Sequence, residues 1–129
     1  MNNRELKFRA WDNLKKKWLK RKVYHFNPHF NEEGIGEFRL SQHPKGFTIQ
    51  QYTGLKDKNG KEIYEGDIVK SYNTDTNTGE DISSIFEVYF DQSFCQFRLK
   101  HRINSYTMSS IEIYCEVIGN IFENPELLK

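Results

Sequence analysis

The sequence predicts a mostly β protein, a small antiparallel SH3-like or open barrel with an N-terminal strand extension and a short C-terminal helical turn. Short apolar runs recur at intervals of roughly ten residues with turn residues between them, as in barrels and sandwiches. Several runs alternate apolar with polar residues, the period of a half-buried strand. Aromatic residues make up 15% of the 129 and offset a low apolar share of 36%, because each buries a large area.

The N-terminal segment predicts two strands. Leu6–Trp11 alternates apolar with basic residues, and Asp12 with Asn13 then supplies a turn, because their short side chains bond nearby backbone. Lys15–Phe26 predicts a second, longer strand. A helix over Leu14–Lys22 stays open as an alternative, since Leu and Lys are good helix formers.

The central part predicts a loop followed by strands. Asn27–Gly46 contains scattered Pro and Gly and predicts a loop, interrupted by a short strand at Glu37–Leu40. Phe47–Tyr52 resumes the alternation of a strand. Asn59-Gly60 predicts a tight hairpin with a type I′ turn, and Ile68–Tyr72 forms the strand that follows it.

The C-terminal part predicts further strands and one helical turn. Asn73–Ser84 is almost devoid of apolar residues and predicts an exposed, mobile loop. Asp91–Ser93 predicts a short hairpin connection. Asn124–Leu128 predicts a helical turn that begins at Pro125 and tucks its two leucines against the barrel. The predicted strands are Ile85–Phe90, Phe94–Leu99 and Ile111–Gly119.

The chain predicts a single domain, 1–129, with a basic strand pair and loop over 1–46 and the barrel-like portion over 47–129. No run approaches the roughly 20 apolar residues of a membrane helix. The N-terminus lacks the apolar centre of a secretory signal. We therefore expect a protein of the bacterial cytoplasm without membrane contact.

The net charge of +1 conceals an asymmetry. Residues 1–22 hold nine bases and two acids, whereas the rest of the chain holds ten bases and sixteen acids. The densest run combines cations with one aromatic ring, as nucleic-acid-binding surfaces do, since cations attract phosphates and a ring can stack on an unpaired base. This candidate binding segment consists of Lys15, Lys16, Lys17, Trp18, Lys20, Arg21 and Lys22.

Two other interpretations of this segment carry more weight. Lysines on an edge strand are an ordinary protection against edge-to-edge aggregation, and Trp18 then belongs to the core. Alternatively, the basic segment docks on the acidic remainder, within the chain or between subunits. A second basic run, Lys100–Arg102, would extend any such patch.

The sequence predicts no catalytic site, no metal site and no cofactor. Glu62, Glu65 and Asp67 flank turns, and no phosphate-binding loop occurs. The four histidines lack a nucleophile in a recognisable arrangement, and Pro28 opposes a helical metal pair of His25 and His29. Cys95 and Cys115 lack the spacing of a zinc site and are expected to be small buried hydrophobes.

Three stretches in one order carry a family resemblance. They are Lys7–Asp12, the long turn-rich motif Gln51–Val69, and Glu116–Leu128. Together they resemble the YopX family of phage and prophage proteins, which implies a genomic setting and no established activity. The residues of the central motif predict structural roles, because its Gly and Asp fall where tight turns need them.

We therefore expect a non-enzymatic accessory protein that acts by binding. The partner expected first is another protein, either a second copy of the chain or a host factor. The alternative is a nucleic-acid-binding module that uses the basic segment.

Overall fold

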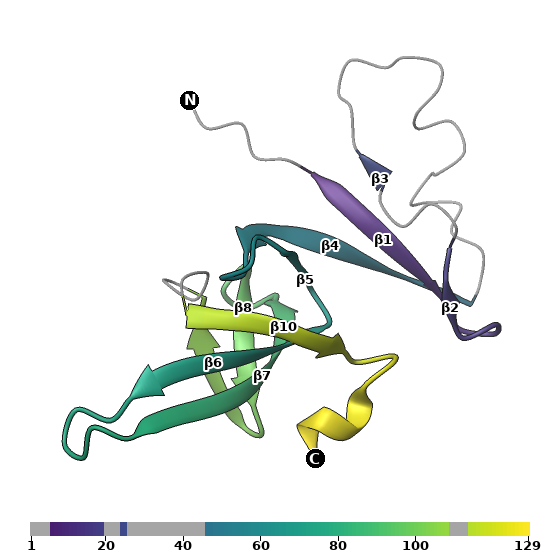
Figure 1. The fold of residues 1–129 in the computed structure, drawn as a ribbon. Helices are drawn as coiled ribbons and strands as arrows, with labels where there is room; N and C mark the ends of the chain where they lie inside the picture. Colours follow the sequence, from purple (N-terminus) through teal and green to yellow (C-terminus); the bar gives the residue numbers. More distant parts are fainter. Residues whose placement is uncertain (1–5, 20–23, 26–45, 109–113) are drawn as a thin grey trace. The chain divides into compact units, whose positions relative to one another are not determined.

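The computed structural model describes residues 6–19, 24–25, 46–108 and 114–129. The chain groups into two compact units, residues 1–54 and residues 55–129. Antiparallel sheets make up most of the described chain, as the sequence predicts (Figure 1). The division of a single domain near residue 46 stays a prediction.

Strand β1 (Lys7–Asp12) organises the first unit. It pairs antiparallel with β4 (Phe47–Lys56) from Phe8 to Asp12, and its ends pair with two short strands. These are β2 (Lys17–Trp18) and β3 (Tyr24–His25). The long strand predicted over Lys15–Phe26 is therefore wrong at its start, where residues 13–16 form a turn. Asp12 explains the turn, because its Oδ1 accepts from the backbone N–H groups of Leu14 and Lys15.

A hairpin joins the end of β4 to β5 (Glu62–Tyr64), as Asn59-Gly60 predicts. The predicted type I′ turn is wrong, because that turn needs a positive φ at both central residues and only Gly60, at +81°, has one. Asp57 sets a different turn, in which its carbonyl accepts from the Gly60 N–H at 3.0 Å. The Asp57 carboxylate also accepts from the N–H groups of Asn59 and Lys61, which fixes the wider loop.

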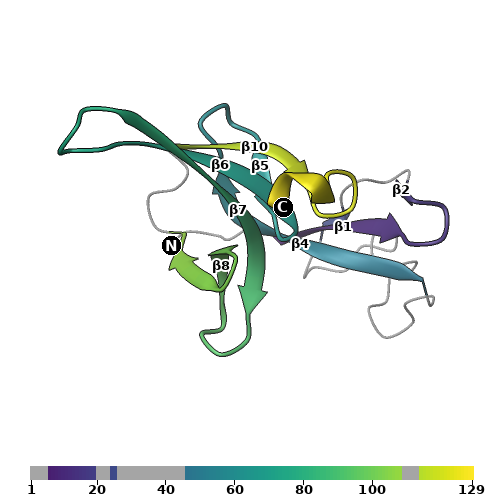
Figure 2. The same ribbon diagram turned by 90° about the horizontal axis from the view of Figure 1, so that it is seen from below.

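The second sheet has the order β10-β6-β7-β8-β9 and lies within the second unit. It curls into a half-barrel, and β7 bends along its length (Figure 2). This confirms the predicted open, mostly β architecture. The strands are β6 (Asp67–Thr74), β7 (Asp81–Asp91), β8 (Gln96–His101), β9 (Asn104–Thr107) and β10 (Cys115–Asn120).

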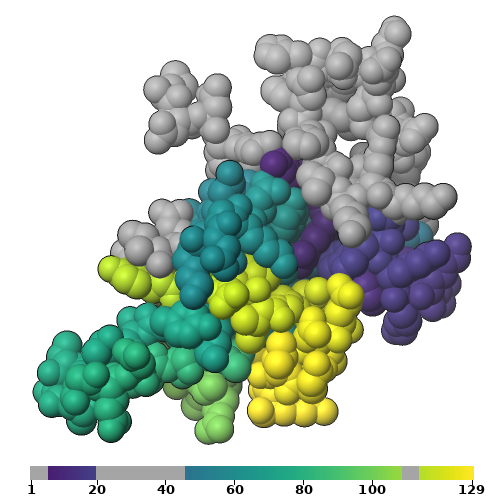
Figure 3. Space-filling model, viewed as in Figure 1, coloured from purple at the N-terminus to yellow at the C-terminus, as the bar shows by residue number. Residues whose placement is uncertain are grey.

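Half of the long loop predicted over Asn73–Ser84 is strand. β6 runs to Thr74 and β7 begins at Asp81, so only residues 75–80 turn the chain. Asp75 closes this turn through its backbone N–H to the Glu80 carbonyl and through its side chain to the Asn77 N–H. Backbone pairing between β6 and β7 continues into the polar ends of these two strands. The end of the β6–β7 hairpin protrudes from the second unit (Figure 3).

The C-terminal segment forms the predicted helical turn as a 3-10 helix, η2 (Pro125–Leu128). Asn124 stands before it but does not cap it with its side chain, which instead accepts from the Asn120 N–H at 3.2 Å. Of the two leucines expected to pack, Leu127 is half-buried and Leu128 stays 38% exposed.

The core of the second unit consists of side chains from β5 to β10. Val69 and Val88 lie on neighbouring central strands and are fully buried. The buried cluster is Ile63, Val69, Val88, Leu99, Met108 and Cys115.

Within the described residues, no helix has the length and apolar content to span a membrane.

Candidate functional site

The structure places part of the basic segment on a hairpin turn. Lys15, Lys16 and Lys17 are all exposed there, beside Leu14, which is 84% exposed. The Lys16 backbone has a φ of 55°, which residues other than glycine rarely adopt. The remaining candidates, Lys20, Arg21 and Lys22, lie outside the described residues.

Trp18 is half-buried and already has two partners. Its ring meets the Trp11 ring edge-on at 5.0 Å between centroids, and the Arg9 guanidinium lies over it at 4.4 Å. A base that stacked on Trp18 would have to displace one of these groups. The structure therefore brings three lysines together but does not pair them with an open aromatic face.

Asp57 illustrates how the central motif uses its polar residues. Its carboxylate is buried and accepts from three backbone N–H groups, those of Asn59, Lys61 and Val117. Desolvation raises the pKa of Asp57, but these hydrogen bonds and the nearby Lys61 charge outweigh it and hold the pKa below the ordinary 3.8. The Val117 bond ties the β4–β5 hairpin to β10.

The acidic cluster Glu62, Glu65 and Asp67 has no metal-site geometry. Asp67 is buried and accepts from the Tyr64 N–H at 2.8 Å, which closes the turn at Gly66. Across the part of the chain that the structure describes, no three His, Cys, Asp or Glu side chains converge as metal ligands would.

Two phenylalanines are exposed where β7 turns into β8. Phe94 in the turn is 61% exposed, and Phe90 at the end of β7 is 44% exposed. Phe90 packs edge-on against Phe97 at 5.3 Å, and the Arg98 guanidinium lies 4.5 Å from the Phe94 ring centroid. We call Phe90, Phe94 and Phe97 the phenylalanine tip. Sequence reasoning missed it because these residues fitted the alternation of two strands.

Asp91 holds the backbone beneath this tip. Its Oδ1 accepts from the N–H groups of Ser93 and Phe94, and its Oδ2 accepts from the Tyr89 hydroxyl. Partial desolvation raises the pKa of Asp91, but the hydrogen bonds and the Arg98 charge outweigh it and lower the pKa below its ordinary value. The carboxylate therefore supports the turn through hydrogen bonds to two of its backbone N–H groups.

The prediction that both cysteines are buried holds for one of them. Cys115 is fully buried in the core, but Cys95 is exposed in the turn of the phenylalanine tip, and neither cysteine forms a disulfide. Cys95 has a φ of 51° and its thiol donates to the Gln92 carbonyl at 3.4 Å. The turn places it outward, although its neighbours in sequence are apolar.

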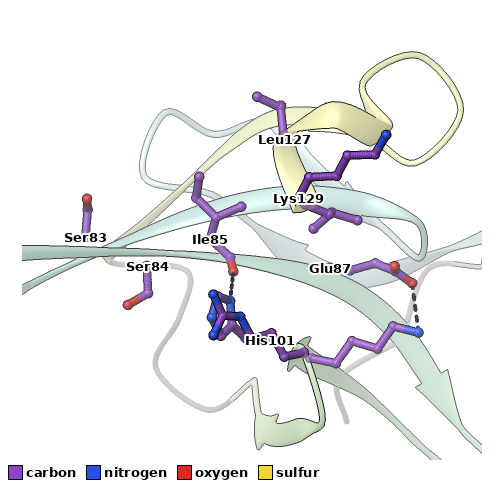
Figure 4. A pocket seen from close by; sticks show the side chains of 10 residues that line it. Ser83, Ser84, Ile85, Glu87, His101, Leu127 and Lys129 are labelled. Carbon is purple, nitrogen blue, oxygen red and sulfur yellow. Dashed lines mark hydrogen bonds and ion pairs between the residues drawn. The ribbon is translucent and has the colours of Figure 1, made fainter.

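A cleft of about 520 Å³ lies between β7, the end of β8 and η2 in the second unit (Figure 4). Lys100, His101 and Arg102 line it, so the second basic run of the sequence borders a concave surface. The Lys100 ammonium pairs with the Glu87 carboxylate at 3.4 Å, and His101 Nδ1 meets the Ile85 carbonyl at 3.0 Å.

Comparison with known proteins assigns a family to this fold. The family model described as YopX protein matches residues 7–129. The chain belongs to the YopX family. The match spans the whole turn-rich motif, and it also covers the segments between the three stretches that carried the resemblance.

Two solved structures share the fold. Protein EF1440 from Enterococcus faecalis matches with a TM-score of 0.61 and 31% identity, over 96% of this chain and 98% of that one. Protein yopX from Bacillus subtilis matches with a TM-score of 0.52 and 19% identity, over 100% and 98%, and supports the fold alone. No curated protein matches. Membership in the YopX family thus brings no assigned activity.

Proposed function

We propose that this YopX-family chain is a non-enzymatic accessory protein of a phage or prophage that acts by binding another protein, either a second copy of itself or a host protein. The contact surface that we assign to this role is the phenylalanine tip. The observation that carries the proposal is Phe94, an aromatic side chain that is 61% exposed on a turn with a fixed backbone.

Exposure alone is common for single apolar residues, so the fixed backbone matters. An aromatic anchor held in its bound conformation loses little conformational entropy when a partner covers it, and such anchors supply much of the binding energy at interfaces. Asp91 holds the turn through its hydrogen bond to the Ser93 N–H. The Arg98 guanidinium lies close to the Phe94 ring and can form the polar edge of a contact surface centred on that ring. Anchor and border together resemble the centre and rim of a small interface.

The alternative, nucleic-acid binding, rests on the exposed side chains of Lys15, Lys16 and Lys17. Three lysines supply phosphate attraction without sequence readout. Trp18 does not add a free stacking face, because Arg9 and Trp11 already contact its ring. Protein binding is therefore the function that the described residues support better.

We expect Phe94→Ser to abolish capture of a specific protein from host lysate, or self-association measured by light scattering, without lowering the melting temperature. Ile103→Ser is the matched control, because Ile103 is 97% exposed in the other turn of β8. If both variants keep the partner, the phenylalanine tip is not the contact surface.

The nucleic-acid alternative has its own readout. A mobility shift that weakens steeply with salt and disappears in the triple variant Lys15→Glu, Lys16→Glu, Lys17→Glu would support it and count against our proposal. No shift at low salt would remove it.

A further inference from the structure

The cleft of the second unit borders a strand edge that β8 leaves uncovered. β7 begins at Asp81, whereas β8 pairs with it only from Glu87 to Asp91. In an antiparallel strand, the N–H and C=O of one residue point to the same edge, and successive residues alternate between edges. The Ile85 carbonyl meets His101 and so faces the β8 side. The backbone N–H groups of Ile85 and of Ser83 therefore face the cleft.

The opposite edge confirms this assignment. The Val88 carbonyl accepts from the Gly66 N–H at 2.7 Å on the β6 side, as the alternation requires for a residue of the other parity. The cleft thus has two backbone donors in a row. In Figure 4, the Ser84 hydroxyl lies on the same side of β7 as His101 and adds a third donor group.

One cation that lacks a counter-charge lines the cleft beside these donors. Lys100 is paired with Glu87, but Arg102 forms no ion pair within the described ranges, whereas the Lys129 ammonium points away from His101 (Figure 4). The second unit as a whole holds eight bases and thirteen acids in residues 55–129. An unneutralised cationic site in an otherwise acidic unit favours an anion at this place.

Arg102 occupies a strained position. Its φ of 55° at the first residue of the two-residue turn between β8 and β9 is one that glycine adopts without cost. Strain of this kind is often found at binding sites, where the side chain has a role that glycine cannot fill. At this position the side chain borders the cleft.

We propose that this cleft binds a small phosphate monoester, with the phosphate held by Arg102 and the backbone N–H groups of Ser83 and Ile85. The volume of about 520 Å³ lies within the range of small-molecule sites. A planar guanidinium and aligned N–H donors match the geometry of phosphate oxygens. This site is separate from the phenylalanine tip and does not depend on the proposed function.

An extended acidic peptide added to the β7 edge is a competing occupant. His101 already occupies the Ile85 carbonyl, which an added strand would need, and the turn at Arg102 stands beside the same edge. The short stretch of uncovered edge therefore favours a compact ligand.

Calorimetric titration of the full chain tests the proposal with inorganic phosphate, adenosine monophosphate, ribose 5-phosphate and adenosine. We expect saturable binding of the three phosphates and none of adenosine. Comparison of adenosine monophosphate with ribose 5-phosphate shows whether the cleft prefers the phosphate of a nucleotide or of a sugar phosphate. Arg102→Gly should weaken binding about tenfold or more, the effect of losing one charge-assisted hydrogen bond, and Arg102→Lys should restore part of it.

Lys16→Gly is the matched control, because Lys16 also has a φ of 55° and the variant also removes one positive charge. It should leave phosphate binding unchanged. The proposal is overturned if no phosphate binds, or if Lys16→Gly weakens binding as much as Arg102→Gly. It is equally overturned if an acidic peptide binds and phosphate does not compete with it.

Discussion

Asp57 shows how much of this fold depends on single polar residues. Its buried carboxylate holds three backbone N–H groups, two in its own hairpin and one on β10. In Asp57→Asn, one carboxylate oxygen becomes an NH₂ group that cannot accept, which leaves a buried N–H unpaired. We expect a loss of about 1–3 kcal/mol in the free energy of unfolding, measured by urea denaturation. Asp75→Asn is the control, because its side chain holds an exposed turn.

The same residue predicts how stability depends on pH. Because the folded state lowers the pKa of Asp57, its stabilisation is fully present above the ordinary value of 3.8 and is lost as the pH falls through the folded-state pKa. The wild-type chain should therefore lose more stability than Asp57→Asn between neutral pH and the acid limit. Equal losses in the two proteins would contradict this role.

Gly119 illustrates the element scale, where β10 meets the segment that leads to η2. A Cβ at this position would lie 2.5 Å from the Asn124 Oδ1, which itself accepts from the Asn120 N–H. Gly119→Ala should cost about 1–3 kcal/mol in the free energy of unfolding, as overpacking does. The double variant with Asn124→Gly should cost less than the sum of the two single variants, because it removes the obstructing side chain.

The elements also show what the sequence can predict. Alternation located β1, β7, β8 and the start of β4, although β1 buries Ala10, Trp11 and Asp12 in succession and so both of its faces. It missed the outer ends of β6 and β7, where Asn73 pairs with Ile82 and the residues are mostly exposed. Asn59-Gly60 predicted the hairpin but not its turn type, since the Asp57 side chain decides that through contacts two and four residues away.

The candidate sites were harder to predict than the elements. The density of lysines at 15–17 is visible in the sequence, but the packing of Trp18 against Arg9 depends on β1 pairing with β2. The phenylalanine tip depends on where a turn lies within an apolar run. The cleft depends on β8 ending opposite the middle of β7, which no local pattern reports.

At the scale of the whole molecule, the buried polar residues of the turn-rich motif build the fold, and the contact surface that we propose lies outside the motif. The motif's Asp57 and Asp67 are buried and bond to backbone. The exposed Phe90 and Phe94 lie outside the motif, whereas Lys56, Lys58 and Lys61 are exposed within it. The contact surface that we propose therefore does not use the buried carboxylates of the most recognisable motif.

Site-specific photo-cross-linking in bacterial cells tests the central claim most directly. A photoreactive amino acid placed at position 94, 103 or 16 reports what contacts each hairpin turn. Our account predicts a discrete cross-linked protein from position 94 and none from position 103 or 16. Cross-links from position 103 alone, or nucleic acid captured from position 16 with no protein captured from 94, would contradict it.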